Sequence, residues 1–295
     1  MPRKVHVVIN PGSGQPKPVL HTLNRVFRTA QVDWDISLTH RSGDAERFAR
    51  QAAEAGVDVV AAFGGDGTVM EVARGLFGTQ VPIAILPGGT ANLMSVELGI
   101  PKGLEEAAAI AANPDSHVRR IDAGRLGETY FLLRVGMGFP AQKVQQADRR
   151  MKDRWGLLAY SLAAVKAVKQ THSAHYRLTL DGQQFEVDSP ACQVYNAGNM
   201  GVASVTPAKN IDVSDGLLDV MALRETALRA ITTKGTDFMH TAPTEELFHH
   251  WQARQIYIEA DPPQLIQVDG EMAGNTPVAI EVIPQILPVL VPGSG

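Results

Sequence analysis

Two kinds of hydrophobic segment alternate over the first part of the chain. Short apolar runs, typical of buried strands, lie at residues 4–9, 35–40, 57–63 and 81–86. Segments whose apolar residues recur at helical spacing follow them, at residues 19–30, 45–56, 69–77, 93–98 and 104–113. Strands that alternate with helices form βαβ units, so we expect a parallel sheet whose ligands bind at the carboxyl ends of its strands.

The pattern changes after Asp122. Short segments rich in β-branched and aromatic residues now follow one another between turns of Gly, Pro, Asp and Asn, with one helical stretch at residues 155–169. The strand-like segments are residues 130–136, 175–182, 183–189, 191–198, 217–223, 254–260, 265–270 and 278–284. This texture predicts a second, mainly antiparallel β domain.

Three of the predicted strands in the first part end in glycine-rich loops: Asn10–Gly14 (NPGSG), Gly64–Thr68 (GGDGT) and Pro87–Leu93 (PGGTANL). A strand-to-helix turn directs the unpaired N–H groups and the positive end of the helix into the loop, which suits phosphate. We expect Thr68 either to cap the helix or to bind a phosphate oxygen. For one loop alone the alternative is an ordinary glycine turn with an Asp cap, but three loops at one sheet edge favour a polyphosphate. None has the Walker spacing, and no G-x-G-x-x-G follows the first strand.

Composition narrows the class of protein. The 295 residues suggest about two domains, and a formal net charge of −4 argues against binding nucleic acid through overall basicity. The single cysteine, Cys192, excludes an intrachain disulfide framework, and its apolar neighbours predict a buried, inert thiol. No apolar run approaches the length that spans a bilayer, which is about 20 residues, and the N-terminus has no secretory signal pattern. We expect a cytoplasmic protein.

The three loops resemble, in order and spacing, the signature of the diacylglycerol kinase and sphingosine kinase catalytic-domain family in its bacterial soluble form. The resemblance continues through residues 135–139, residues 197–220 and the VDGE of residues 268–271, and so covers nearly the whole chain. It implies an α/β domain with a parallel sheet, similar to NAD kinase and phosphofructokinase, over residues 1–122. A β-rich domain that binds lipid and contributes to catalysis would span residues 123–295. The implied activity is ATP- and Mg²⁺-dependent phosphorylation of a lipid hydroxyl, in the cleft between the two domains.

The resemblance also assigns roles to single residues. ATP would be held by Asn10, Ser13, Gly14, Thr39, Gly64, Gly65, Asp66, Gly67, Thr68 and Thr90. Glu271 matches the general base that takes the proton of the lipid hydroxyl, with Asp269 in support. Asp66 would orient Mg²⁺ or accept a proton, its alternative being a purely structural loop residue. Glu71 is either a first-turn acid that suits the helix dipole or a residue with a secondary metal-binding or hydrogen-bonding role.

A structural Mg²⁺ site is implied in the segment IDVSDGLLD, with the carboxylate of Asp215 and the carbonyls of Asp212 and Leu217 as oxygen ligands. An Asp-Gly turn without metal is the alternative. The chain departs from the family pattern at two positions, Gln15 and Leu93, where many diacylglycerol-specific members carry a basic residue and an Asp. This departure makes diacylglycerol itself doubtful as the acceptor and leaves Asp122 to pair elsewhere, with Lys17 or Arg125.

The basic run Lys143–Trp155 precedes an apolar helix-like stretch. It is either a solvated face or a transient contact with the anionic inner membrane surface. Two rival functions share the nucleotide loops: a NAD kinase-like enzyme, and a nucleotide-binding regulator without turnover, which the changes at Gln15 and Leu93 would suit. The acceptor lipid and the oligomeric state are not specified by the sequence.

Overall fold

The computed structural model describes residues 2–13, 18–138, 173–198, 211–227, 230 and 243–293. The chain divides into two compact units. The first unit comprises residues 1–123, 213–215 and 283–295, and the second comprises residues 124–212 and 216–282. The structure does not describe residues 14–17 and 139–172. The basic run Lys143–Trp155 and the predicted helix at 155–169 lie in the second of these ranges.

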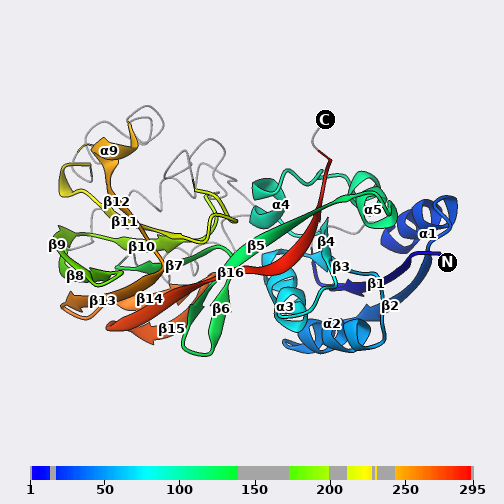
Figure 1. Cartoon of the computed structure of the whole chain (residues 1–295), viewed down its shortest axis with the longest axis horizontal. Helices are drawn as coiled ribbons and strands as arrows, with labels where there is room; N and C mark the ends of the chain where they lie inside the picture. Colours follow the sequence, from blue (N-terminus) through cyan, green and yellow to red (C-terminus); the bar gives the residue numbers. More distant parts are fainter. Residues whose placement is uncertain are drawn as a thin grey trace. The chain divides into compact units, whose positions relative to one another are not determined.

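The first unit is built on parallel strands, as the alternating pattern predicts. Strands β1 (Lys4–Ile9), β2 (Asp33–Leu38), β3 (Val59–Gly64) and β4 (Ile83–Pro87) lie in the order β2-β1-β3-β4. The helices are α1 (Val19–Thr29), α2 (Asp44–Glu54), α3 (Asp66–Leu76), α4 (Leu93–Glu97) and α5 (Leu104–Ala112). Helices α2 and α3 pack together, as do α1 and α5, and Figure 1 shows α2 and α3 on the opposite side of the strands from α5.

The burial of each strand agrees with its position in the sheet. Every residue of the central strands β3 and β4 is buried, whereas the edge strand β2 is only partly covered. Strands covered on both faces read as continuous apolar runs, which is the pattern of residues 57–63 and 81–86. In α3, the predicted apolar stripe is buried at Val69, Val72, Ala73 and Leu76. The helix ends at Leu76, so Phe77 lies just beyond it.

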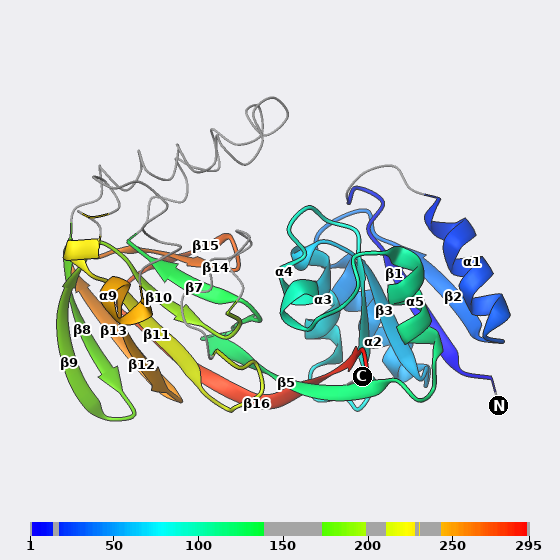
Figure 2. The same ribbon diagram turned by 90° about the horizontal axis from the view of Figure 1, so that it is seen from above.

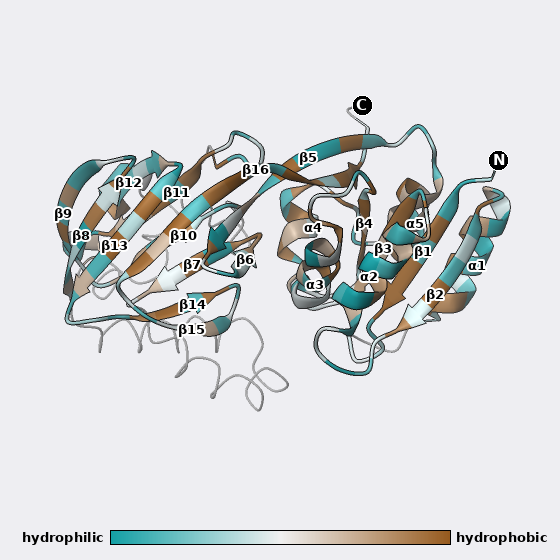
Figure 3. Ribbon diagram, turned by 60° about the horizontal axis from the view of Figure 1, so that its bottom comes forward, coloured by the Kyte–Doolittle hydropathy of each residue, from teal (hydrophilic) through white to brown (hydrophobic). Residues whose placement is uncertain are grey.

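The second unit is mainly antiparallel. One sheet has the strand order β12-β11-β10-β7-β14-β15, and the other contains β8, β9 and β13 beside β16. The bounds are β6 (Thr129–Phe131), β7 (Arg134–Met137), β8 (Ala174–Leu180), β9 (Gln183–Ser189), β10 (Cys192–Tyr195), β11 (Leu218–Leu223), β12 (Phe248–Ala253), β13 (Gln255–Asp261), β14 (Leu265–Val268) and β15 (Glu271–Asn275), with a short helix α9 (Thr244–Leu247). Alternate residues of these strands form one hydrophobic core, and Figure 3 shows the alternation along β13.

Two strands belong to both units. Strand β5 (His117–Leu126) leaves the first unit, and β16 (Val278–Val291) begins in the second unit and ends in the first. The final part of β16 runs parallel to β4, with Val289 opposite Ile83. Figure 2 shows β5 and β16 running alongside each other. The return of residues 283–293 to the first unit was not expected from the sequence, which suggested a single boundary after Asp122. No helix in the described ranges is long and apolar enough to cross a membrane.

Candidate active site

Four strand ends meet at one edge of the first unit's sheet. Strands β2, β1, β3 and β4 are neighbours and parallel, so the segments that follow them leave the same edge. These segments carry Thr39, the loop from Asn10, the loop from Gly64, and the loop from Pro87. The structure therefore brings together the described parts of the predicted nucleotide loops.

Asn10 links the first two of these loops. Its Nδ2 donates to Oγ1 of Thr68 at 3.1 Å, and its Oδ1 accepts from the amide of Gly12 at 3.0 Å. Its own amide donates to the carbonyl of Phe63 at the end of β3. Asn10 thus fixes the turn that it begins and ties that turn to the start of α3.

Glycine is required where the second and third loops touch. The amides of Gly88 and Gly89 donate to the carbonyl of Gly64 at 2.9 and 3.2 Å. A Cβ atom on Gly89 would lie 2.5 Å from Cα of Gly65, closer than side chains approach a backbone. The two loops therefore pack backbone against backbone, an arrangement that a side chain at Gly89 would push apart.

Asp66 and Thr68 both have partners within the protein. Helix α3 begins at Asp66, three residues earlier than the apolar stripe suggests, so Thr68 lies inside its first turn and does not cap it. The Thr68 hydroxyl is buried and bound by Asn10, and Oδ1 of Asp66 accepts from the amide of Met94 at 3.2 Å. Burial raises the pKa of Asp66, while hydrogen bonds from amides at the start of α4 oppose the rise.

The other predicted ATP ligands differ in exposure. Ser13 and Thr39 are half-buried, Gly67 and Thr90 are exposed, and Gly14 lies outside the described residues. The amide of Ser13 donates to the carbonyl of Asn10, and that of Thr39 to the carbonyl of Ile9. These positions leave hydroxyls and glycine backbone at the sheet edge, which fits the oxygen-rich surface of a polyphosphate.

Glu71 forms hydrogen bonds, which is one of its predicted roles, and its partners belong to the start of a neighbouring helix. Its Oε2 accepts from the amides of Gly43 and Ala45 at 3.0 and 3.2 Å, and its Oε1 accepts from Oγ of Ser42 at 3.2 Å. It therefore lies at the N-terminus of α2, a neighbouring helix, where the dipole favours a negative charge. By this contact α3 holds the segment that follows Thr39.

We expect Glu71→Gln to lower the free energy of unfolding by about 1–3 kcal/mol, because an amide has one acceptor oxygen for several donors. Urea unfolding monitored by circular dichroism would measure the loss. Glu54→Gln, at the exposed C-terminal end of α2, is the matched control and should change stability little. Equal stability of Glu71→Gln and wild type would contradict the capping role.

In the second unit, Asp269, Gly270 and Glu271 form the end of a hairpin. Asp269 and Gly270 have φ of 46° and 98° between β14 and β15, the geometry of a two-residue Asp-Gly turn. The Asp269 carboxylate accepts from the amides of Leu132, Leu133 and Arg134 at 2.9, 3.2 and 2.8 Å. Glu271 is exposed at the first position of β15. Asp269 thus holds the hairpin against the start of β7, while Glu271 presents its carboxylate to solvent.

Burial raises the pKa of Asp269 to about 6, although the three amides favour its ionised form. A carboxyl group with a higher pKa in the folded chain than in the unfolded chain binds its proton more tightly when folded. Its contribution to stability is therefore complete below about pH 4 and is lost as the pH rises through about 6.

We expect the free energy of unfolding of wild type, relative to that of Asp269→Asn, to fall as the pH rises from about 4 to above about 6. Urea unfolding of both proteins at a series of pH values would measure it, and a pH-independent difference would contradict the raised pKa.

Asp122 is fully buried at the end of the first unit. Its Oδ1 accepts from the amide of Gln285 in β16, and its own amide donates to the carbonyl of Val213, both at 2.7 Å. Arg125, one of its two suggested partners, donates to Glu281, and Lys17 lies outside the described residues. Asp122 therefore binds together three chain segments that are far apart in the sequence.

The predicted Mg²⁺ ligands lie in the turn that precedes β11. Asp212 and Asp215 are exposed and Leu217 is half-buried. Among the described residues no group of three or more His, Cys, Asp or Glu side chains could hold a metal ion. The predicted site has one carboxylate and two backbone carbonyls, so it is not a group of this kind and its absence from such groups does not test it. This Mg²⁺ site therefore stays a prediction.

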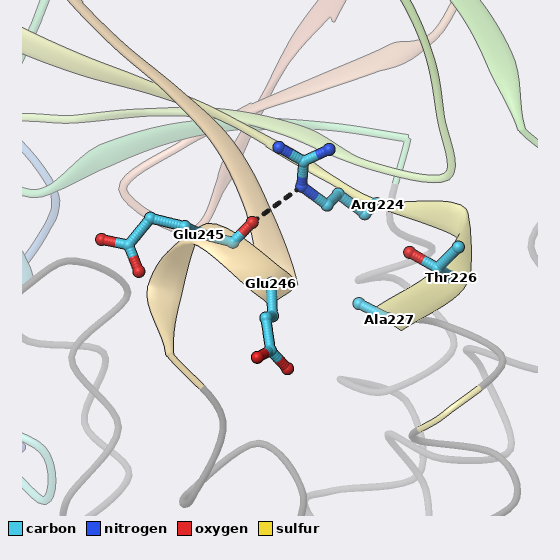
Figure 4. Close-up of a pocket in the computed structure, with 5 residues that line it drawn as sticks. All are labelled: Arg224, Thr226, Ala227, Glu245 and Glu246. Atoms are coloured by element: carbon cyan, nitrogen blue, oxygen red, sulfur yellow. Dashed lines mark hydrogen bonds between the residues drawn. The ribbon is translucent and has the colours of Figure 1, made fainter.

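Two further features of the second unit have no place in the site. Cys192 is buried, and burial raises the pKa of its thiol to about 12, in agreement with the inert thiol that the sequence predicts. A hollow of about 340 Å³ is lined by Arg224, Thr226, Ala227, Glu245 and Glu246. Figure 4 shows that Arg224 turns to the Glu245 carbonyl and that the two carboxylates point in different directions, so the polar groups do not converge.

Comparison with known proteins shows similarity over the whole chain. Residues 4–126 match the sequence model of the diacylglycerol kinase catalytic domain, and residues 134–291 match that of the YegS C-terminal NAD kinase beta sandwich-like domain. An uncharacterized protein of Synechocystis sp. is 30% identical, over 97% of this chain and 70% of its own length. A protein named as a putative lipid kinase in Staphylococcus haemolyticus is 29% identical, over 86% of this chain and 84% of its own. The crystal structure of a putative diacylglycerol kinase from Bacillus anthracis superposes with a TM-score of 0.83, at 28% identity, over 99% of this chain and 98% of that one.

Proposed function

Because the chain belongs to the bacterial lipid kinase family that is built on a diacylglycerol kinase catalytic domain, we propose that it transfers the γ-phosphoryl group of ATP to a hydroxyl group of a lipid or lipid-like acceptor. The observation that carries this proposal is the meeting of the glycine loops at one sheet edge. They are joined there by the bond from Asn10 to Thr68 and by those from Gly88 and Gly89 to Gly64. The proposed site of action is the cytoplasm, with a transient contact at the inner face of the membrane as the alternative.

The residues at this edge fit a nucleotide triphosphate. Glycine backbone, the start of α3 and the hydroxyls of Ser13 and Thr90 supply neutral donors and a positive helix end, without a bulky cation. Mg²⁺, when bound, would neutralise charge on the phosphates. Asp66 would orient this Mg²⁺, and Asp215 would supply a carboxylate to a separate structural Mg²⁺ site, since a hard cation prefers oxygen ligands.

The roles that remain for the second unit are those of Glu271 and Asp269. In the proposed reaction the acceptor oxygen forms a bond to the γ-phosphorus, the bond from that phosphorus to ADP breaks, and the hydroxyl proton passes to the Glu271 carboxylate. Asp269 is a positioning residue, because its carboxylate is engaged by three backbone amides and fixes the hairpin on which Glu271 lies.

Incubation of the purified protein with Mg-ATP and a mixed-micelle panel tests the proposal. The panel holds diacylglycerol, monoacylglycerol, a sphingoid base, ceramide and phosphatidylglycerol, with NAD in a separate reaction, and products are identified by mass. A lipid that gains one phosphate is the expected result. Phosphorylation of NAD alone would replace the proposal with a NAD kinase activity, and ATP binding without any product would replace it with a nucleotide-binding regulator.

A further inference from the structure

The segment of residues 40–45 connects the end of β2 to helix α2 and carries an exposed arginine. We call this segment the β2–α2 corner. The amide of Thr39, just before it, donates to the carbonyl of Ile9 at 2.9 Å. The chain therefore leaves β2 beside the loop that begins at Asn10, because β1 and β2 are parallel neighbours. The β2–α2 corner thus borders the edge where the glycine loops meet.

The backbone of the β2–α2 corner is already hydrogen-bonded within the chain. Oδ2 of Asp44 accepts from the amides of His40 and Arg41 at 3.0 and 3.2 Å. The amide of Asp44 donates to the Arg41 carbonyl at 3.3 Å, and the Glu71 carboxylate binds two further amides, as described above. Since these amides are occupied, we expect a contact from this corner to an anion to come from a side chain.

Two arginines share the carboxylate of Asp44, and they are held differently. Nη2 of Arg47 lies 2.8 Å from Oδ1 of Asp44, and its guanidinium lies over the ring of Phe48, 4.2 Å from the centroid. Nε of Arg41 lies 3.7 Å from the same oxygen. The Arg41 side chain is 84% exposed, compared with 49% for Arg47. Arg47 thus has a short ion pair and a ring contact, whereas Arg41 has a long ion pair.

Asp44 can release the Arg41 side chain at little cost. The Asp44 carboxylate is buried, but it keeps the ion pair with Arg47 and the two backbone amides, so its charge does not become unpaired. The two guanidiniums also repel each other, because both lie beside one oxygen. An exposed ion pair stabilises a fold little. Arg41 is therefore a cation whose backbone is fixed at the sheet edge and whose side chain is available to a ligand.

We propose that Arg41 binds the triphosphate of the nucleotide, and that Asp44 is the positioning residue that holds Arg41 at the edge of the site. This inference rests on the proposed kinase function and deepens it by adding a cation to the neutral donors of the glycine loops. A guanidinium donates charge-assisted hydrogen bonds to phosphate oxygens, which its planar fork matches. Neighbouring strands are about 4.8 Å apart, so the loop after β1 is within the range of an arginine side chain on the segment after β2.

Equilibrium dialysis of the full chain with Mg-ATP, with adenosine and with a short-chain phospholipid tests the inference. We expect Arg41→Gln to weaken ATP binding by about 3- to 10-fold and to leave the binding of adenosine and phospholipid unchanged. Raising the NaCl concentration should narrow the difference in ATP affinity between wild type and Arg41→Gln, because salt screens exposed charges. Arg50→Gln, on an exposed arginine of α2 that pairs with Glu46 on the same helix, is the matched control and should bind ATP as wild type does.

A second variant separates charge from shape. Arg41→Lys keeps the charge without the planar fork and should bind ATP more tightly than Arg41→Gln but less tightly than wild type. Thermal unfolding of each variant should match wild type, because the side chain is exposed.

Equal ATP affinities of wild type and Arg41→Gln would overturn the inference, as would an equal loss of adenosine binding. A loss confined to the phospholipid would also overturn it and would assign Arg41 to the acceptor. Weaker ATP binding by Arg41→Gln, without phosphoryl transfer to any lipid by wild type, would remove the kinase function and keep the contact. Transfer to a lipid with the same KM for ATP in both proteins would keep the kinase and remove the contact.

Discussion

We expect Glu271→Gln to lower kcat for phosphoryl transfer by about 10²- to 10⁴-fold, the usual effect of removing a general base. The amide keeps the size of the side chain but cannot take the hydroxyl proton. Because Glu271 is exposed at the first position of β15, its substitution should leave folding unchanged. The affinity for ATP should also stay the same, since in our proposal the glycine loops of the first unit hold the nucleotide.

Single-turnover assays of purified wild type and variant, with the acceptor identified from the lipid panel, would measure the change in rate. Thermal unfolding of both proteins would check that the variant is folded. Glu186→Gln is a matched control on another exposed strand position and should retain wild-type kcat. If Glu271→Gln transferred phosphate at a rate within about 3-fold of wild type, well below the usual contribution of a general base, proton transfer would have to be assigned elsewhere.

The largest effect on stability is expected from Gly89→Ala. The added Cβ would lie 2.5 Å from Cα of Gly65 and 3.2 Å from its nitrogen, and backbone cannot rotate away as a flexible side chain does. We expect a loss of about 3 kcal/mol, at the upper end for overpacking, and a fall in Tm of about 6–12 °C. Because the same contact joins two nucleotide loops, ATP affinity should fall as well.

Gly67→Ala provides the control within the same loop. Its Cβ would meet no atom within 4 Å, and the residue lies in the first turn of α3, where alanine is favourable. Its Tm should therefore match or slightly exceed that of wild type. Differential scanning calorimetry of the three proteins would compare them, and equal Tm values for Gly89→Ala and Gly67→Ala would show that the loops do not pack as described.

The parts of the fold that were predictable from the sequence are those whose pattern is local. Continuous apolar runs identified β1, β3 and β4, because strands buried on both faces have no polar positions. Helical spacing identified α1, α2 and α5 to within one or two residues. The clustering of the glycine loops followed from the rule that parallel strands end at one edge.

The parts that were missed depend on tertiary contacts. Strand β15 is a short, exposed edge strand of sequence EMAGN, and β5 begins with the polar run HVRR, so neither has a strand-like pattern. Thr68 does not cap α3, because the helix starts earlier, at Asp66, whereas its role as a phosphate ligand stays a prediction.

The path of β16 bears on how the protein is made. Strand β4 would be left with an open edge until residues near Val289 pair with it, and Leu287, Val289 and Leu290 are buried in the completed unit. These residues are synthesised after the whole of the second unit. The first unit therefore cannot complete its sheet while the chain is emerging from the ribosome. An unpaired strand edge is prone to association with other chains, so the nascent first unit has to be kept apart from its neighbours until residues near Val289 have been synthesised.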